Sequence, residues 1–528
     1  MAPLEIRPIV IYSLVFCVIV LALFFYHFRS NLSALGASLR VPILKHLVYR
    51  PAIGSRRFQV QWTRADVLAE LAYLGLNVFC VYFKSPTLSS AGLRAANLCI
   101  VNLVFLCATP HLDTLTNTLG LQWCTVRRFH GSVGVMATLL LGFHLVAFAV
   151  SPVSFPVWKA ENKWAVVAAT SIGLLVTLCL PAIRNSWYEL FLRVHQGLAI
   201  LSVYAIWVHI AQRPLLPRFY LYTLAGGAGL STLVLGCLIW RRNGILSYRL
   251  PRADVMNSKG AVLVRVVLSR PVRVRAGQYI SLWLFMPSTS FHSLFEYHPF
   301  MVASWSDAPL ATLDLLIEPR GGLTRHLLHR SQMRQDLCRA FFSGPHGNSV
   351  PVGQYEVVLM VASGYGIAAQ LPYLKQLLHE YNSRKARSRR IHLVWELKTL
   401  DLAMAIESLL NDALRDDTLD NGYISVYVED VQRSDKISSR AEVIKGLPDW
   451  YSIVKDEVAG KYIKRVQEEA STRGDMVVTG KCLLLTLLTK RLTVIVATST
   501  GIRQELRAIV QRFVDNKVDL VELDYQPS

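Results

Sequence analysis

The first half of the chain consists of long apolar runs, whereas the second half alternates short apolar and polar stretches. An α-helix needs about 20 mainly apolar residues to cross a bilayer. Arg7 precedes the first run as in a signal peptide, but no clear small-residue cleavage site comes after it, so a retained helix is favoured. The runs therefore predict seven membrane helices, at residues 8–28, 66–83, 95–112, 128–150, 164–181, 187–210 and 218–240.

The fourth and sixth runs each carry two histidines fourteen positions apart, His130 with His144 and His195 with His209. Fourteen helical residues make about 3.9 turns and rise about 21 Å, so the members of each pair share one face near opposite sides of a membrane. A single membrane histidine can simply hydrogen-bond a neighbouring helix. Ionisable groups in a membrane are usually functional, however, and two equal spacings favour two metal centres with bis-histidine ligation, as in electron-transfer haems.

The composition agrees with a membrane protein. Of the 528 residues, 52% are hydrophobic and only 17% are charged, and the mean hydropathy is +0.35. The net charge of +20 forms no long basic tail, so membrane topology explains it better than nucleic acid does. The nine cysteines form no C-x-x-C motif and lie mostly in the apolar half, which favours packing cysteines over a disulfide framework or a zinc site.

Basic residues gather in the loop at 29–65 and beside alternate ends of the later runs. The positive-inside rule places this side in the cytoplasm, with the N-terminus outside and the second half of the chain cytosolic. The first histidine of each pair is then the inner one. Arg128 and Arg193 each precede an inner histidine by two residues, and they suit haem propionates and simple positive-inside anchors equally well.

Residues 246–345 alternate in short strands broken by proline and glycine, which predicts a small antiparallel β-barrel. A strand at 312–318 precedes the sequence Arg320-Gly321-Gly322-Leu323-Thr324, which opens a helix. Backbone N–H groups at a glycine-rich helix start suit a pyrophosphate, although an ordinary turn with a helix cap explains the pattern as well.

From residue 346 strands and helices alternate, which predicts a doubly wound α/β sheet. A buried strand at 356–362 leads into the glycine turn at 363–369 and a helix, the arrangement that binds dinucleotide phosphates. A second strand follows at 391–396. The basic residues around it could select NADPH over NADH, although a solvated charge run explains most of them individually: Arg384, Lys385, Arg387, Arg389, Arg390 and Lys398.

The remaining elements complete the sheet. The pattern predicts helices at 402–414, 461–473 and 502–516, and strands at 424–429, 492–497 and 518–524. Residues 431–460 are polar and irregular and are assigned no function.

Taken in order, these segments resemble fungal ferric-chelate reductases of the ferric reductase and NADPH oxidase superfamily, over almost the full length. The two H-x13-H helices match the haem helices of that family. The segments GQYI, HPFMVAS, RGGLTRHL, GPHG, VASGYGIAAQLPYL and HLVWEL match its flavin and pyridine-nucleotide segments. The resemblance implies a haem-binding transmembrane domain at 1–245, an FAD-binding β-barrel at 246–345 and an NADPH-binding α/β domain at 346–528, the last two forming a ferredoxin-NADP reductase-like module.

The resemblance also implies the cofactors, namely two haem b, FAD and NADPH, and their contacts. The four paired histidines would ligate haem iron. Flavin contacts would be His298, Pro299, Phe300 and Met301 at the ring and ribityl chain, and Arg320, Gly322 and Thr324 at the pyrophosphate. NADPH contacts would be Gly344, Pro345, Gly364, Gly366, Ile367 and Ala368, and Tyr525 would cover the flavin as a C-terminal aromatic does in relatives.

Three segments depart from the family pattern. A Cys-Gly-Pro element usually follows the last apolar strand, whereas this chain has Ser499-Thr500-Gly501. Gly131 and Ser132 replace the usual aromatic and basic pair after the first haem histidine, and GPHG replaces GPYG. None of these changes removes a haem ligand.

The activity implied is transmembrane electron transfer from cytosolic NADPH through FAD and the inner and outer haems to a ferric chelate or siderophore, or to cupric ion. The implied setting is the lipid of the plasma membrane, with the vacuolar membrane as the alternative, and an iron permease or oxidase as a partner. Two rival functions remain open at this point. One is an NADPH oxidase that produces superoxide, and the other is a haem-binding membrane protein without reductase activity, suggested by the altered turn at 499–501.

Overall fold

The computed structural model describes residues 41–52, 62–107, 111–119, 121–152, 155–186, 188–212, 215–245, 250–285, 297–332, 337–415, 422–429, 441–462 and 492–523. The chain divides into two compact units. The first contains Asp66–Leu238, and the second contains Leu32–Ala65 together with Ile239–Ser528.

The first unit is helical. Among the described residues, five helices are long and apolar enough to cross a membrane, not the seven predicted. These are α3 (Arg64–Tyr82), α4 (Leu88–Cys107), α6 (Trp123–Ala149), α9 (Tyr188–His209) and α10 (Leu215–Arg242). The predicted run at 164–181 does form a helix, α7 (Ala160–Leu178), but Glu161 and Lys163 make its first turn polar. The predicted run at 8–28 lies outside the described residues, and α5 (Leu112–Leu119) and α8 (Pro181–Ser186) are short.

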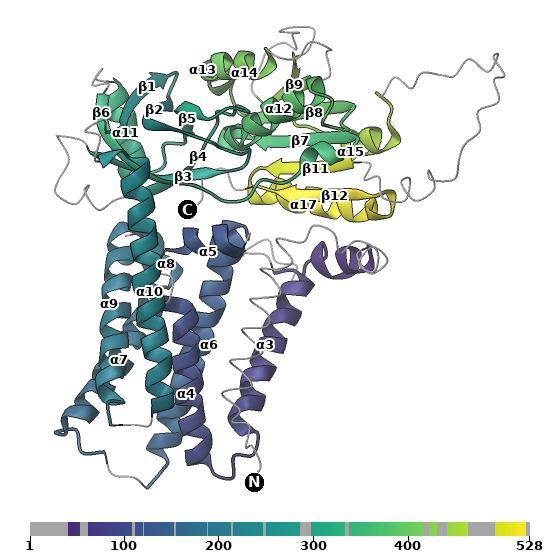
Figure 1. The fold of residues 1–528 in the computed structure, drawn as a ribbon. Helices are drawn as coiled ribbons and strands as arrows, with labels where there is room; N and C mark the ends of the chain where they lie inside the picture. Colours follow the sequence, from purple (N-terminus) through teal and green to yellow (C-terminus); the bar gives the residue numbers. More distant parts are fainter. Residues whose placement is uncertain are drawn as a thin grey trace, which may run out of the picture. The chain divides into compact units, whose positions relative to one another are not determined.

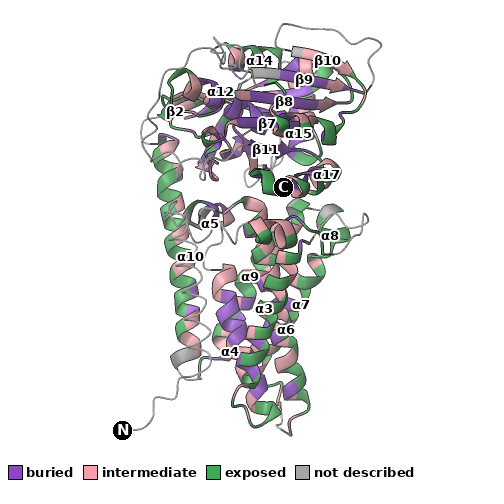
Figure 2. Ribbon diagram, turned by 90° about the vertical axis from the view of Figure 1, so that its right-hand side faces the viewer, coloured by how far each residue is buried: buried purple, intermediate pink, exposed green. Residues whose placement is uncertain are grey.

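The helices of this unit pack in pairs, α4 with α6 and α7 with α9. Small residues allow the close approach, since a β-carbon on Gly92 would lie 2.6 Å from the Cβ of Ala147. Large apolar side chains such as Val146 and Ile200 remain exposed, as Figure 2 shows for much of the helical surface. An apolar exterior of this extent is what a lipid-facing surface requires.

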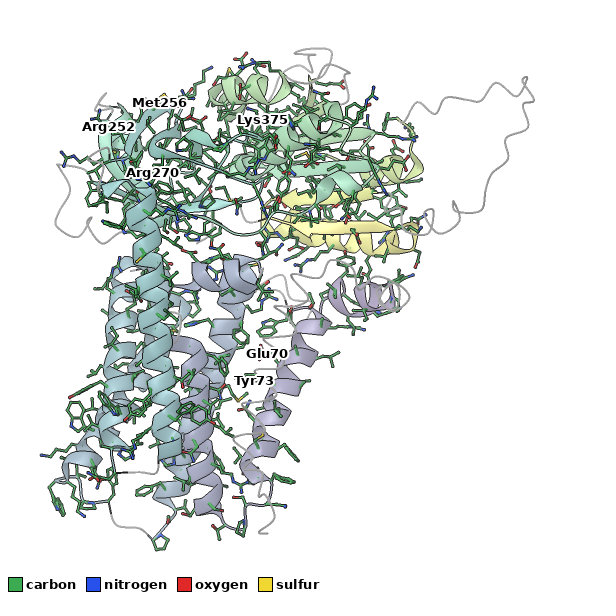
Figure 3. All side chains as sticks on the ribbon, viewed as in Figure 1. Glu70, Tyr73, Arg252, Met256, Arg270 and Lys375 are labelled. Carbon is green, nitrogen blue, oxygen red and sulfur yellow. The ribbon has the colours of Figure 1, made fainter. Side chains whose placement is uncertain are left out.

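A polar stripe along α3 contacts its neighbours. Arg128 Nη1 on α6 lies 2.8 Å from Asp66 Oδ1, so this arginine, considered above for a propionate, pairs with a carboxylate. Ser132 donates a hydrogen bond to Glu70, and Tyr73 donates one to the buried Asn102 on α4. Figure 3 shows Glu70 and Tyr73 on the side of α3 that faces these helices.

The second unit begins with a six-stranded antiparallel sheet in the order β4-β3-β6-β1-β2-β5 (Figure 1). An isolated bridge between Val302 and Leu315 links its two edges, and Ala303 N–H donates to Asp314 O at 2.8 Å. One helix, α11 (Gly322–Gln332), follows β5. The strands are β1 (Arg252–Ser258), β2 (Ala261–Val272), β3 (Tyr279–Phe285), β4 (His298–Met301), β5 (Leu310–Ile317) and β6 (Leu337–His346).

The second sheet is entirely parallel, with the order β10-β9-β8-β7-β11-β12. The chain order reverses between β7 and β11, and ligands of such sheets bind at this switch point, beyond the carboxyl ends of the strands. The strands are β7 (Val357–Ser363), β8 (Arg390–Leu397), β9 (Gly422–Val428), β10 (Ala441–Lys445), β11 (Leu492–Ala497) and β12 (Val518–Glu522). The principal helices are α12 (Ile367–Asn382), α15 (Trp450–Ala459) and α17 (Thr500–Arg512).

Two predictions for this sheet were wrong. The stretch at 431–460 is not irregular throughout, because it contains β10 and α15, whose Trp450 and Val454 are buried. The predicted helix at 402–414 is interrupted at the buried residue Ile406 and forms α13 (Asp401–Ala405) and α14 (Glu407–Leu414). Most of the predicted helix at 461–473 lies outside the described residues.

Candidate functional site

His130 on α6 and His195 on α9 face each other. Their ring centroids are 6.3 Å apart, with the ring planes inclined at 54°. Two imidazole nitrogens on opposite sides of one metal ion, each at about 2 Å, place the ring centroids about 6 Å apart. This pair therefore has the separation that a shared iron requires.

The second histidine of each helix has its Nδ1 atom against a backbone carbonyl. His144 Nδ1 lies 3.0 Å from Gly92 O, and His209 Nδ1 lies 3.0 Å from Glu161 O. A carbonyl accepts only from a protonated nitrogen, so these contacts fix the hydrogen on Nδ1 and give Nε2 the lone pair. This is the usual support for a metal-bound histidine.

The surroundings of these histidines fit a porphyrin. Gly134 lies four residues after His130 on the same face of α6, and no atom lies within 4 Å of the place its β-carbon would take. Helices α6 and α9 pack on α4 and α7, and their contact with each other is slight at most. Within the described ranges, no group of three or more His, Cys, Asp or Glu side chains is arranged to hold a bare metal ion. Two histidines alone would suit haem iron, whose porphyrin would supply the other ligands.

The segment expected to contact the flavin forms β4 at the edge of the antiparallel sheet. Phe300 and Met301 are only 1% and 3% exposed, so the Phe300 side chain belongs to the hydrophobic core and can offer a ligand little more than its backbone. His298 and Pro299 are half-buried and lie nearer the surface. The sequence missed this division of the strand into a half-buried first part and a buried second part.

The segment expected to hold the FAD pyrophosphate forms the turn before α11. Thr324 Oγ1 accepts hydrogen bonds from the backbone N–H of Arg320 at 2.9 Å and of Gly321 at 3.3 Å. Gly322 has a φ of +49°, and no atom lies within 4 Å of a β-carbon built on Gly321. Arg320 Nη2 lies 2.7 Å from Glu318 Oε2. A glycine turn with open space at a helix start fits an anionic group, and Thr324 shapes the turn through its hydroxyl.

The glycine turn after β7 lies at the switch point of the parallel sheet. Gly364 has a φ of +50°, and its carbonyl accepts a hydrogen bond from Trp395 Nε1 at 2.9 Å. The backbone of Gly366 is against Ala497 at the end of β11, and Ser499 N–H donates to Ser363 Oγ at 3.0 Å. The turn at 499–501, which departs from the family pattern, is thus joined directly to the glycine turn. Ile367 and Ala368 begin α12 and are buried.

The flavin and nucleotide segments approach each other within the second unit. Burial raises the pKa of Tyr365 in the glycine turn, and the charge of Glu318, beside the α11 turn, raises that pKa further. Gly344 and Pro345 end β6, and Val350 N–H, shortly after them, donates to Tyr373 Oη on α12 at 3.1 Å. The segment after β6 therefore contacts α12, the helix that follows the glycine turn. Tyr525 lies outside the described residues.

The basic cluster, in contrast, lies at the wrong end of the sheet for phosphate selection. Arg390 begins β8, and the five basic residues from Arg384 to Arg390 all stand at or before the amino end of that strand. The ends of β8 are roughly 23 Å apart, whereas the glycine turn is at the carboxyl edge. Arg390 is engaged with Glu457, 2.8 Å away. Only Lys398 of the set follows β8 on the carboxyl side, where it is exposed.

These features are those of a membrane protein in which apolar helices with paired histidines precede an antiparallel and a parallel sheet. Sequence models of three families match the chain in order: the ferric reductase like transmembrane component at residues 94–206, an FAD-binding domain at 247–350, and the ferric reductase NAD binding domain at 355–481. The chain is similar to the ferric reductase family in its transmembrane and NAD-binding segments.

Two relatives and one solved structure are similar to parts of the chain. The probable cell surface ferric reductase kap2 of Aspergillus oryzae is 25% identical over 403 residues, which is 68% of this chain and 52% of that protein. Ferric reductase transmembrane component 3 of Saccharomyces cerevisiae is 25% identical over 49% of this chain and 36% of its own length. The chain thus spans about half or less of these two relatives. A flavohemoglobin structure from Malassezia yamatoensis, with bound FAD and heme, is 12% identical, covering 84% of this chain and 99% of that chain with a TM-score of 0.39.

Proposed function

We propose that this protein carries electrons across a membrane from NADPH to a ferric chelate, with FAD and two bis-histidine haems as its cofactors. The observation that supports this most strongly is the 6.3 Å separation of the His130 and His195 rings on two membrane helices of a chain that also contains FAD- and NAD-binding domains. When bound, FAD would accept a hydride and release single electrons, and haem would carry single electrons.

The residues have separate tasks in this proposal. His130 and His195 hold one iron, and His144 and His209 hold the other, with Gly92 O and Glu161 O fixing the tautomer of the second pair. His298 and Pro299 border the flavin. The N–H groups at the α11 turn and at the glycine turn after β7 hold the two pyrophosphates.

The division of the chain at residues 245 and 345 into haem, FAD and nucleotide domains is part of the proposal. So is an orientation with the first histidine of each pair toward the cytosol, which rests on the excess of basic residues on that side. The cell-surface assignment of the Aspergillus relative supports the plasma membrane. Siderophores are a further acceptor class, and an iron permease or oxidase is a further partner, on the same grounds of family membership.

The preference for NADPH rests on Lys398. It is the one member of the predicted basic cluster on the carboxyl side of the sheet, two residues past Glu396, which pairs in register with Ser363 before the glycine turn. An exposed ammonium there suits the additional phosphate of NADPH.

The experiment that tests the electron path compares two acceptors in full-length protein. His144→Ala and His209→Ala should abolish reduction of ferric citrate across the membrane while NADPH-dependent reduction of a soluble dye remains. His111→Ala, a histidine of the apolar half outside the two pairs, serves as the matched control. Full ferric reduction in the His144 and His209 variants would overturn the proposal. Superoxide formation by the wild-type protein without ferric reduction would identify dioxygen as the electron acceptor in place of a ferric chelate.

A further inference from the structure

Helix α7 supplies a polar neighbour to each histidine of α9, the helix that lies beside it (Figure 1). The first turn of α7 presents Glu161 O to His209 Nδ1 at 3.0 Å. Cys179, the residue directly after α7, has its Sγ atom 3.9 Å from His195 Nδ1. The two helices therefore run antiparallel, and α7 contacts the Nδ1 atom of both histidines on its neighbour.

The end of α7 fixes the position of the Cys179 thiol. The backbone N–H of Cys179 donates to Leu175 O at 3.1 Å, which closes the last turn of the helix. Pro181 then begins α8, so the chain turns away directly after the thiol. Helix α8 also packs on α9. The thiol thus belongs to a segment that is held against α9 both before and after it.

The His195 ring is oriented by three neighbours. The ring of Phe191, one turn earlier on α9, lies 5.4 Å from the His195 ring between centroids, and the His130 ring on α6 lies 6.3 Å away. The sulfur of Cys179 is the third neighbour, at Nδ1. Because Nδ1 faces the sulfur, Nε2 is the nitrogen available to a metal ion. This is the arrangement found at His209, with sulfur in place of a carbonyl oxygen.

The two kinds of acceptor differ in strength. A thiol sulfur accepts a hydrogen bond only weakly, whereas a backbone carbonyl oxygen is a strong acceptor. A hydrogen bond donated by Nδ1–H makes the imidazole a more basic ligand, and such bonds are one means by which a protein sets the reduction potential of haem iron. A more basic ligand favours the ferric ion, which has the higher charge. A weaker acceptor at Nδ1 therefore gives a higher potential.

We propose that Cys179 is a positioning residue for His195, and that its weak hydrogen bond gives the iron site of His130 and His195 a higher reduction potential than a carbonyl partner would. This role rests on the proposed function, in which these two histidines hold one iron. The site of His144 and His209 has a carbonyl at both histidines. The two sites are therefore built differently, and the first is made the better electron acceptor by its thiol.

The test replaces the sulfur with a stronger acceptor and, separately, with none. Cys179→Asn offers an amide carbonyl oxygen to His195 Nδ1, as the backbone does at the other site, whereas Cys179→Ala removes the acceptor. Cys179 is exposed, so truncation leaves no cavity in the core of the helices. The purified full-length protein is titrated against electrode potential under nitrogen, and the haem absorbance gives the midpoint potentials.

The two variants should shift one midpoint potential in opposite directions. Cys179→Asn should lower the equilibrium constant for reduction by about fivefold and Cys179→Ala should raise it by about threefold, which correspond to about 40 mV and about 30 mV for a one-electron couple. The potential of the other site should stay at its wild-type value. Cys237→Asn and Cys237→Ala, at an exposed cysteine on α10, are the matched controls and should leave both potentials unchanged.

Opposite signs distinguish a hydrogen bond to His195 from a general effect on packing. Shifts of the same sign in both Cys179 variants, or wild-type potentials in both, would overturn the proposed role of the thiol. The haem-to-protein ratio, measured first by the pyridine haemochrome spectrum, separates this result from failure of the proposed function. Absence of haem would refute the electron path and the role of Cys179 together, whereas unchanged potentials with two haems bound would refute the role of Cys179 alone.

Discussion

A β-carbon on Gly366 would overlap the carbonyl oxygen of Ala497, because the turn after β7 and the end of β11 touch through backbone atoms. Gly366→Ala should therefore push the glycine turn away from the switch point and lower NADPH-dependent dye reduction by at least about tenfold, with the FAD content retained. Steady-state kinetics with a soluble dye and the flavin absorbance of purified protein measure the two quantities.

The neighbouring turn offers the control for this change. Gly501 is the second residue of α17, and no atom lies within 4 Å of its β-carbon position. Gly501→Ala should leave the dye reduction near wild type. Equal effects of the two alanines would mean that close backbone approach is not what Gly366 supplies.

Gly134→Val should lower the haem content without unfolding the helices. The added side chain fills the open space beside His130 that we assign to a porphyrin, and the second histidine pair lies about 15 Å or more further along the helix. The haem-to-protein ratio, measured by the pyridine haemochrome spectrum, should fall from about two to about one. Gly75→Val on α3, where a β-carbon also meets open space, should leave the ratio unchanged.

Lys398→Ala should reduce the preference for NADPH over NADH. Loss of one ammonium contact to the additional phosphate predicts a rise of about tenfold in KM for NADPH and little change for NADH. Arg389→Ala carries the same charge change at the opposite edge of the sheet, where Arg389 is 3.8 Å from Glu356, and should leave the ratio alone. A larger effect from Arg389 than from Lys398 would restore the basic cluster as the selective element.

Glu457→Gln should destabilise the nucleotide-binding sheet by about 3–5 kcal/mol at neutral pH, because it leaves the Arg390 guanidinium, only 15% exposed, without its carboxylate. Burial alone would raise the pKa of Glu457, but hydrogen bonds from His392 and Arg390 outweigh burial and hold that pKa below its ordinary value. A carboxyl with a lowered folded pKa stabilises the protein above its unfolded pKa of about 4.3 and loses this contribution as the pH falls through the folded value. Thermal unfolding should therefore separate variant from wild type most at neutral pH and less in acid.

Glu396 provides a control for the same pH titration, because its pKa is shifted in the opposite direction to that of Glu457. Burial, followed by the charges of Glu429 and Glu505, raises its pKa. A raised carboxyl pKa costs stability as the pH rises from about 4.3 through the folded value, so Glu396→Gln should stabilise the protein at neutral pH. Parallel pH profiles for the two glutamine variants would contradict both assignments.

The sequence was informative where a short motif and its periodicity specify an element. Equal spacing placed His130 and His195 on helices, and the glycines at 364 and 366 identified the turn at the switch point. The misplaced basic cluster shows a different limit, because charge alone suggested a phosphate site. Residues before a parallel strand stand at its amino end, so the predicted topology already contained the signal that only Lys398 is on the ligand side.

The remaining features depend on contacts between distant residues. The segment containing α15 appears polar because its buried Trp450 and Val454 are flanked by the charged residues Asp449, Lys455 and Asp456. Glu457 is stabilised there by Arg390 and His392, which come from β8. The segment at 41–52 appears as one more basic loop until Lys45 meets Asp515. No local sequence pattern predicts a contact between two residues that lie 470 positions apart.

Asn243 directly follows α10, and both of its side-chain amide atoms bond to Phe342 on β6. The helical rotation at the end of α10 therefore determines where this amide points. Each residue added to an α-helix rotates the chain beyond it by about 100° and advances that chain by about 1.5 Å. Loops elsewhere in the chain can change length with little consequence. A single residue inserted between Ile239 and Asn243, by contrast, would rotate the Asn243 amide away from Phe342 on β6, so the spacing of these last residues is under a constraint that their sequence does not reveal.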